Sequence, residues 1–246
     1  MFNFFLDNAC LDNETYRIDG GNFNHIKNVL RMRVGDEIYV SHDGVSDLCS
    51  ITDFTEDCVI VKIIEKNALD SALPINVTLF QGLPKSDKLE LIIQKAVELG
   101  ACAVVPVEMK NCVVKIEDKK KDSKRARWQS ISESAAKQSK CNFIPEIYHP
   151  MSFNDALKHA QQLDLVIVPY ENECGMQSTK SALSKIKKGM NVGVFIGPEG
   201  GFDKNEIELL KNINAMTVSL GKRILRTETA SITALVALML HAETNI

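Results

Sequence analysis

The stretch VFIGPEGGFDKNE, residues 194–206, indicates how the C-terminal half of this chain folds. It begins with an apolar run of the kind that forms a buried strand, and it ends in an acidic segment typical of a helix. Asp203 followed three residues later by Glu206 is the pattern of a capping box, which marks the start of that helix. Between strand and helix lies a tight turn that contains Gly197, Pro198, Gly200 and Gly201. This order predicts an α/β fold with a loop able to hold a ligand.

A carboxylate, Glu199, lies in the middle of the glycine turn and restricts what the turn can bind. The turn lacks the Gly-Lys-Ser/Thr ending of a nucleoside triphosphate loop and the full G-x-G-x-x-G of a dinucleotide fold. Glu199 would repel a phosphate, whereas a ligand with a neutral or cationic end suits it better. S-adenosylmethionine is such a ligand, because it carries a sulfonium and an ammonium group. The loop alone is equally consistent with a tight turn that holds no ligand.

The segment LGKRILRTETA, residues 220–230, is a second candidate for the same site. It follows an apolar strand, passes through a glycine turn, and places Arg226 immediately before a predicted helix. We expect Thr227 to cap that helix and Glu228 to interact favourably with its dipole. Because ligands in open α/β sheets bind at the carboxyl ends of strands, the two loops are expected to form one pocket, with the strand end at 169–171 as a third candidate.

The rest of the C-terminal half alternates between strand-like and helix-like segments, which predicts a parallel sheet. Pro106 marks the edge or the end of its strand. The expected strands are 75–83, 101–109, 163–170, 191–197 and 215–221, and the expected helices are 86–100, 123–140, 204–213 and 227–242. Ser86 or Asp87 is expected to cap the first of these helices, and Gly100 to end it.

The N-terminal part has a different pattern, with short strands and one helix over residues 1–70. Residues 22–32 place Phe23, Ile26, Leu30 and, less clearly, Val29 on one helical face. Strands are expected around 37–40, after the Asp43-Gly44 turn, and at 58–66. We therefore expect a small β-barrel over residues 1–70, joined by a linker at 67–74 to a second domain over 73–246.

Composition limits the class of protein. The chain has 246 residues, of which 45% are hydrophobic and 25% charged, and a net charge of −3, so a polyanion would have to be bound by a local basic patch. Seven cysteines without a C-x-x-C pair predict free thiols, and the five histidines do not pair with cysteines at zinc spacing, so we expect no metal. The N-terminus is not a signal peptide, and the apolar run 232–240 is too short to span a bilayer. We expect a cytoplasmic protein with no membrane partner.

Taken together, the motifs IGPEGGF…E and LGKRILRTETA closely resemble the RsmE family, the small-subunit ribosomal RNA uridine-N3 methyltransferases of the SPOUT superfamily. The resemblance extends over nearly the whole chain. It includes HIKNVLRMRVGD at 25–36, PKSDKLELIIQKAVELG at 84–100 and RARWQSISESAAKQSKCNFIPEI at 125–147.

The resemblance implies a fold and a reaction. The fold would be α/β, with a PUA-like RNA-binding barrel over 1–70 and a SPOUT parallel-sheet domain with a trefoil knot over 73–246. The cofactor would be S-adenosylmethionine, and the substrate a uridine N3 in 16S ribosomal RNA near the decoding centre. The enzyme would be a homodimer. The last helix has more apolar surface than one face needs, in Ile232, Leu235, Val236, Leu238 and Met239.

The resemblance also assigns roles to residues at matching motif positions. The cofactor loop would contain Gly197, Pro198, Glu199 and Gly200, and the loop enclosing the adenine would contain Leu220, Gly221, Ile224 and Leu225. Glycines there are expected to let the backbone approach the ligand closely. Arg226 would lie at the reactive edge, where a fixed cation stabilises negative charge on the uracil oxygens. The alternative for Arg226 is a salt bridge to Glu228 or Glu199.

Basic residues are the candidates for RNA contact: Arg31, Arg33, Lys124 and Arg125. Trp128, beside the last two, is expected in the core. The chain departs from the family pattern at Lys137, where an acid is usual, and at Cys141, where an arginine is usual, so neither position receives a role. Two other functions remain open: a SPOUT methyltransferase with a different RNA target, and a non-catalytic RNA-binding protein of ribosome assembly.

Overall fold

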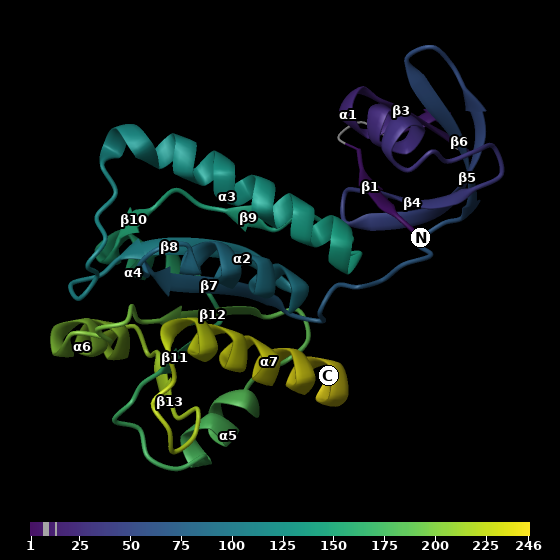
Figure 1. Ribbon diagram of the computed structural model, residues 1–246. Coiled ribbons are helices and arrows are strands. Elements are labelled where there is room, and N and C mark those ends of the chain that lie inside the picture. The colour runs from purple at the N-terminus through teal and green to yellow at the C-terminus, as the bar shows by residue number, and fades with distance from the viewer. Residues whose placement is uncertain (7–9, 13) are drawn as a thin grey trace. The chain divides into compact units, whose positions relative to one another are not determined.

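The computed structural model describes residues 1–6, 10–12 and 14–246, with side chains described for all of these except 10–12 (Figure 1). The chain divides into two compact units. The first contains Met1–Ala72 together with Ala136–Ile144, and the second contains Leu73–Ala135 together with Pro145–Ile246. No pattern in the sequence predicted that residues 136–144 would belong to the first unit. Among the described residues, no helix has the length and apolarity needed to cross a membrane.

The first unit is built on a six-stranded sheet in the order β1-β4-β5-β6-β3-β2. Its strands are β1 (Asn3–Phe5), β2 (Cys10–Asp12), β3 (Thr15–Asp19), β4 (Glu37–His42), β5 (Val45–Phe54) and β6 (Cys58–Glu65). The predicted turn between β4 and β5 is confirmed. Asp43 and Gly44 both have positive φ, at 46° and 78°, as a two-residue hairpin turn of the primed type requires.

The helix predicted at 22–32 is shorter and irregular. It consists of α1 (Gly20–Asn24) followed by a π-helical turn, η1 (His25–Val29), in which the Leu30 N–H donates to the His25 carbonyl five residues earlier. Ile26 is fully buried, and Phe23 and Leu30 pack against the core of the unit. Val29 is 63% exposed, so its expected place on the same face is wrong. The wider π turn changes the angular spacing on which that expectation depended.

The second unit contains a seven-stranded sheet in which every pairing is parallel, as the alternation of strands and helices predicted. The order is β10-β8-β7-β12-β11-β13, with β9 paired to β8. The strands are β7 (Asn76–Gly82), β8 (Ala101–Glu108), β9 (Glu146–Ile147), β10 (Met151–Ser152), β11 (Leu165–Pro169), β12 (Asn191–Ile196) and β13 (Met216–Val218).

Helices cover both faces of this sheet. They are α2 (Lys88–Glu98), α3 (Asp118–Ser139), α4 (Phe153–Ala160), α5 (Gln177–Leu183), α6 (Lys204–Asn212) and α7 (Thr227–Asn245). One core cluster takes side chains from α2, α3, α5 and α7, and a second takes them from α4 and α6. Trp128 of α3 is 4% exposed in the first cluster, which confirms its place in the core.

Local signals in this unit are mostly confirmed. Asp203 and Glu206 form the predicted capping box at the start of α6. Gly100 ends α2 with φ of +81°, whereas Asp87 occupies the N-cap position of α2 without a side-chain capping bond. Pro106 lies inside β8 and not at its end. On the side of β8 that faces away from β7, residues 103–104 pair with β9 and residues 107–108 pair with β10. Pro106 lies between these two pairings, where a missing N–H costs little.

Candidate active site

A cavity of about 420 Å³ opens at the carboxyl ends of β11, β12 and β13, where the sequence placed the three candidate loops. Its volume is in the range of small-molecule sites, roughly 300–1,000 Å³. Nine residues were predicted for the cofactor loops and the reactive edge, and eight of them line this cavity: Gly197, Pro198, Glu199, Leu220, Gly221, Ile224, Leu225 and Arg226. The motifs at 194–206 and 220–230 therefore meet in space, as predicted.

Gly200 is the ninth predicted residue, and it does not line this cavity. A Cβ placed on Gly200 would lie 3.0 Å from the Cβ of Asn111, which is tighter than ordinary contact. The Asn111 side chain donates to the carbonyl oxygens of Gly200 and Gly201 at 3.1 and 3.2 Å. Close packing against the segment after β8 is therefore by itself a reason for a residue without a side chain at position 200.

Two other glycines hold the loop in its tight shape. A Cβ on Gly82, at the end of β7, would lie 2.7 Å from the N and Cδ of Pro198. A Cβ on Gly197 would lie 3.2 Å from the backbone carbonyl carbon of Gly201. The importance of Gly197 was predicted. That of Gly82 was not, because a glycine is required there by Pro198, which is more than a hundred residues away in the chain.

A buried hydrogen-bond chain connects β7, the glycine loop and α7. Gln81, fully buried, donates through Nε2 to the Thr227 hydroxyl at 2.9 Å, and that hydroxyl donates to the Gly197 carbonyl at 2.7 Å. The Ser231 hydroxyl, one turn along α7, lies within hydrogen-bond distance of Gln81 Oε1. Thr227 was expected to cap α7, and this is wrong: Arg226 occupies the N-cap position, and the Thr227 side chain fastens the helix to the glycine loop.

Glu199 is paired within the protein. Its carboxylate accepts from the Lys85 backbone N–H at 3.1 Å and from Lys88 Nζ at 3.0 Å. Lys88 also lies 3.4 Å from Glu228 Oε2, so one ammonium joins the start of α2, the glycine loop and the first turn of α7. Burial alone would raise the pKa of Glu199, but the hydrogen bonds from Lys88 and from the backbone outweigh it and lower the pKa. Glu199 therefore fixes the loop, and its charge is already compensated.

This pairing predicts a pH dependence for the Glu199→Gln variant. A lowered pKa in the folded state contributes stability that is present above the ordinary carboxyl value of 4.5 and is lost as the pH falls through the folded value. We expect the difference in free energy of unfolding between wild type and Glu199→Gln to be largest near neutral pH and to shrink in acid, as measured by urea unfolding at several pH values. Glu243→Gln, at an exposed position of α7, is the control. A difference that stays constant with pH would contradict the assignment.

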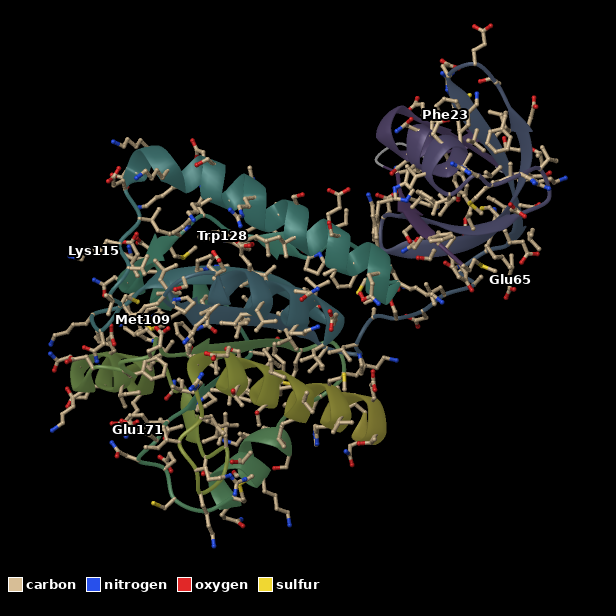
Figure 2. The ribbon with its side chains drawn as sticks, in the orientation of Figure 1. Phe23, Glu65, Met109, Lys115, Trp128 and Glu171 are labelled. Carbon is tan, nitrogen blue, oxygen red and sulfur yellow. The ribbon has the colours of Figure 1, made fainter. Side chains whose placement is uncertain are left out.

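Arg226 lies at the rim of the cavity with an exposed side chain. Among the described residues it makes no ion pair, and both carboxylates proposed as its alternative partners, Glu199 and Glu228, face Lys88. Two further carboxylates line the cavity. Glu173 accepts a hydrogen bond from the Thr217 hydroxyl. Glu171, labelled in Figure 2, lies in the loop after β11. Its Oε1 is 3.9 Å from the position that a Cβ on Gly201 would take.

The four residues predicted to contact RNA differ in how far their side chains are exposed and free to bind a phosphate. Arg31, Arg33 and Lys124 have exposed side chains, and Arg31 has a positive φ of 53°. Arg125 is only half-buried, but its Nε donates to the Ile147 carbonyl at 2.9 Å, so it holds α3 to β9. Cys141, one of the departures from the family pattern, is buried, and burial raises the pKa of its thiol.

The described part of the chain contains free thiols and no arrangement of side chains typical of a metal site. The six cysteines with described side chains are free, whereas Cys10 lies outside the described side chains. In that same described part of the chain, no group of three or more His, Cys, Asp or Glu residues is arranged to hold a metal ion.

Comparison with known proteins identifies the family. The family described as RNA methyltransferase domain matches residues 71–239, and the one described as RNA methyltransferase PUA domain matches residues 18–68. The ribosomal RNA small subunit methyltransferase E of Bacillus subtilis is 42% identical over 234 residues, covering 93% of this chain and 91% of that protein. The protein of the same name from Mesomycoplasma hyopneumoniae is 34% identical over 171 residues, covering 70% and 72% of the two chains.

A relative of known structure matches this chain over nearly its full length. The crystal structure of the ribosomal RNA small subunit methyltransferase E of Neisseria gonorrhoeae, bound to S-adenosyl methionine, superposes with a TM-score of 0.81 at 28% identity, covering 98% of this chain and 97% of that one. The matches span both units, which confirms the resemblance drawn from the two motifs. This chain belongs to the ribosomal RNA small subunit methyltransferase E (RsmE) family.

Proposed function

We propose that this protein transfers the methyl group of S-adenosylmethionine to N3 of a uridine in 16S ribosomal RNA near the decoding centre. The observation that carries the proposal is the cavity between the two family motifs, with Arg226 at its rim and without an ion pair among the described residues. The names of the relatives from Bacillus and Mesomycoplasma, which specify small-subunit ribosomal RNA, support the substrate class. The ligand bound by the Neisseria relative supports the cofactor.

The residues of the cavity fit this cofactor. Ile196, Leu220 and Leu225 offer apolar walls to an adenine, and the glycine-rich backbone allows close approach. Because Glu199 is paired with Lys88, the carboxylates that remain for a positive group of the cofactor are Glu171 and Glu173. When bound, S-adenosylmethionine supplies a methyl group that its sulfonium already activates. The protein's own task is then mainly to align the acceptor with it.

Arg226 is proposed to act on the acceptor. Uridine N3 carries a proton at neutral pH, and its loss leaves negative charge on the ring oxygens. A guanidinium beside those oxygens stabilises that charge and makes N3 a better nucleophile. Arg226 suits this role because its charge is not compensated by Glu199 or Glu228, both of which face Lys88.

A division of labour between the two parts of the chain is also proposed. Residues 1–70 would bind RNA through Arg31 and Arg33, and residues 73–246 would carry the cofactor site, with Lys124 as a further phosphate contact. The family resemblance further implies that the last helix is threaded through a trefoil knot. The compartment would be the cytoplasm, where such a substrate is made.

The reaction can be tested with purified protein, S-adenosylmethionine and small-subunit RNA, naked or in subunits. Digestion and mass spectrometry should find one added methyl group, on the base of one uridine and at N3. A methyl group on ribose or on another RNA would favour the alternative of a different target. A protein that binds the RNA but adds no methyl group would favour the non-catalytic alternative.

We also propose a homodimer that uses the apolar surface of the last helix. Leu235 and Leu238 of α7 are buried in the core, whereas Leu240 is 52% exposed. Light scattering at micromolar concentration should report twice the 27.4 kDa of one chain. Leu240→Glu should shift the protein toward monomer, and Leu209→Glu, at an exposed position of α6, should not. A stable monomer of the wild-type protein would refute the proposal.

A further inference from the structure

The loop at the rim of the cavity, residues 222–226, has an exposed surface made of three cations and one large apolar side chain. Lys222, Arg223, Ile224 and Arg226 are exposed, and all four line the mouth of the cavity. Ile224 is 86% exposed, the highest value among the large hydrophobic side chains that the structure describes. The resemblance places it in the loop that encloses the adenine of the cofactor, and its exposed side chain is also open to a substrate that reaches the same cavity.

Hydrogen bonds hold the loop at both of its ends, and they fix the position of this surface. Before the loop, the Ser219 carbonyl accepts from the Thr179 hydroxyl at 2.6 Å, and the Ser219 hydroxyl accepts from the Gly221 N–H at 3.2 Å. After the loop, the Thr227 hydroxyl donates to Gly197. Gly221, with φ of +111°, supplies the turn that few other residues adopt.

The charge of the loop points to a polyanion. Lys222, Arg223 and Arg226 make no ion pairs among residues 1–6, 10–12 and 14–246 as described, although the chain as a whole has a net charge of −3. Three cations without an ion pair within five residues give this loop a local positive charge, although Glu171 and Glu173 line the same cavity. Phosphate groups of a nucleic acid complement such a surface, and an acidic or apolar protein partner explains only part of it.

We propose that the rim loop docks the substrate RNA strand: Lys222 and Arg223 bind backbone phosphates next to the target, and Ile224 packs against the face of the unstacked base. This rests on the proposed function. N3 lies on the Watson–Crick edge of uracil, so the target uridine has to be unpaired when it reacts, and its faces are then open to an apolar side chain. Arg226 remains available for the reacting base itself.

The charge contacts are tested by the salt dependence of RNA binding, with cofactor saturating. For single-stranded RNA each phosphate contact contributes about 0.7 to the slope of log K against log salt, so Lys222→Gln with Arg223→Gln should reduce the slope by about 1.4. The control pair, Lys187→Gln with Lys188→Gln, removes the same charge from exposed positions just before β12, at the end of that strand opposite to the cavity. A slope that is unchanged, or equally changed in the control, overturns the phosphate contacts.

The apolar contact is tested by Ile224→Ser. Loss of about half of a buried isoleucine side chain corresponds to roughly tenfold weaker RNA binding, with the salt slope retained. Val113→Ser, at a side chain that is 70% exposed and outside the cavity, is the control and should have no effect. Equal RNA affinity for Ile224→Ser and wild type overturns the base contact.

These outcomes separate the docking surface from the reaction. If the loop variants bind RNA like wild type while the wild-type protein methylates small-subunit RNA, the docking proposal is wrong and the proposed function stands. If the wild-type protein neither binds nor methylates that RNA, both are wrong.

Discussion

Replacing Arg226 with alanine should slow methyl transfer by about 10²–10³-fold, as loss of one donor from an oxyanion site does, while the cofactor and the RNA still bind. The reason is the position of this side chain. It ends the loop that lines the cavity, and neither Glu199 nor Glu228 neutralises it, because both face Lys88. An interaction made only with the developing charge on uracil lowers the barrier and contributes little to binding of the ground state.

Single-turnover rates at saturating cofactor and RNA measure this effect without a contribution from affinity. Arg226→Lys keeps the charge but loses the planar fork of donors, so an intermediate rate is expected. Arg31→Ala with Arg33→Ala is the matched comparison, since it removes cations from the first unit. It should weaken RNA binding and flatten its salt dependence while leaving the saturated rate near that of wild type. A wild-type rate for Arg226→Ala would mean that the arginine has only a structural role.

Replacing Thr227 with valine should destabilise the second unit by about 1–3 kcal/mol, the cost of leaving buried polar groups without partners. The change keeps the shape of the side chain and removes its hydroxyl. The Gly197 carbonyl then loses its donor, and Gln81 Nε2 keeps only the Gly82 carbonyl. Because the same hydroxyl fastens α7 to the cofactor loop, cofactor affinity should fall as well.

Urea unfolding and calorimetry with S-adenosylmethionine measure the two consequences of Thr227→Val separately. Thr229→Val is a matched control, because it makes the same chemical change two residues along α7 at an exposed position. If both valine variants have the same stability and the same cofactor affinity, the hydrogen-bond chain does not hold the loop.

Much of this fold could be predicted from local sequence signals, because those signals act over a few residues. The capping box at Asp203, the Asp43-Gly44 turn and the end of α2 at Gly100 depend only on backbone conformation and immediate neighbours. The alternation of apolar runs with helical periods was enough to predict a parallel sheet. The short strands β1, β2 and β3 carried no such signal, since three to five residues give too few repeats of an alternating pattern.

The parts of the site that were not predicted depend on residues far apart in the chain. Ser231 meets Gln81 across 150 positions, and Lys88 meets Glu199 across 111. These pairs follow from the order of strands in the sheet, which places β7 beside β12. Local patterns do not give that order. The same limit explains why the packing of Gly200 against Asn111 was not predicted.

The structure also explains why the glycine turn has a negative residue at its centre. The negative charge of Glu199 does not require a cationic ligand, because Lys88 and the Lys85 N–H already compensate that charge. Its effect is to fix the turn between α2 and α7. The binding surface that remains is made of backbone, apolar side chains, the carboxylates Glu171 and Glu173, and the basic loop 222–226.

The most direct test of the account is to map modified uridines in small-subunit ribosomal RNA from cells that lack this protein and are complemented with wild type or with Arg226→Ala. We predict that one N3-methylated uridine is absent without the protein, returns with wild type, and does not return, or returns only in part, with the variant at equal protein level. An identical set of N3-methylated uridines in cells with and without the protein would contradict the proposed function.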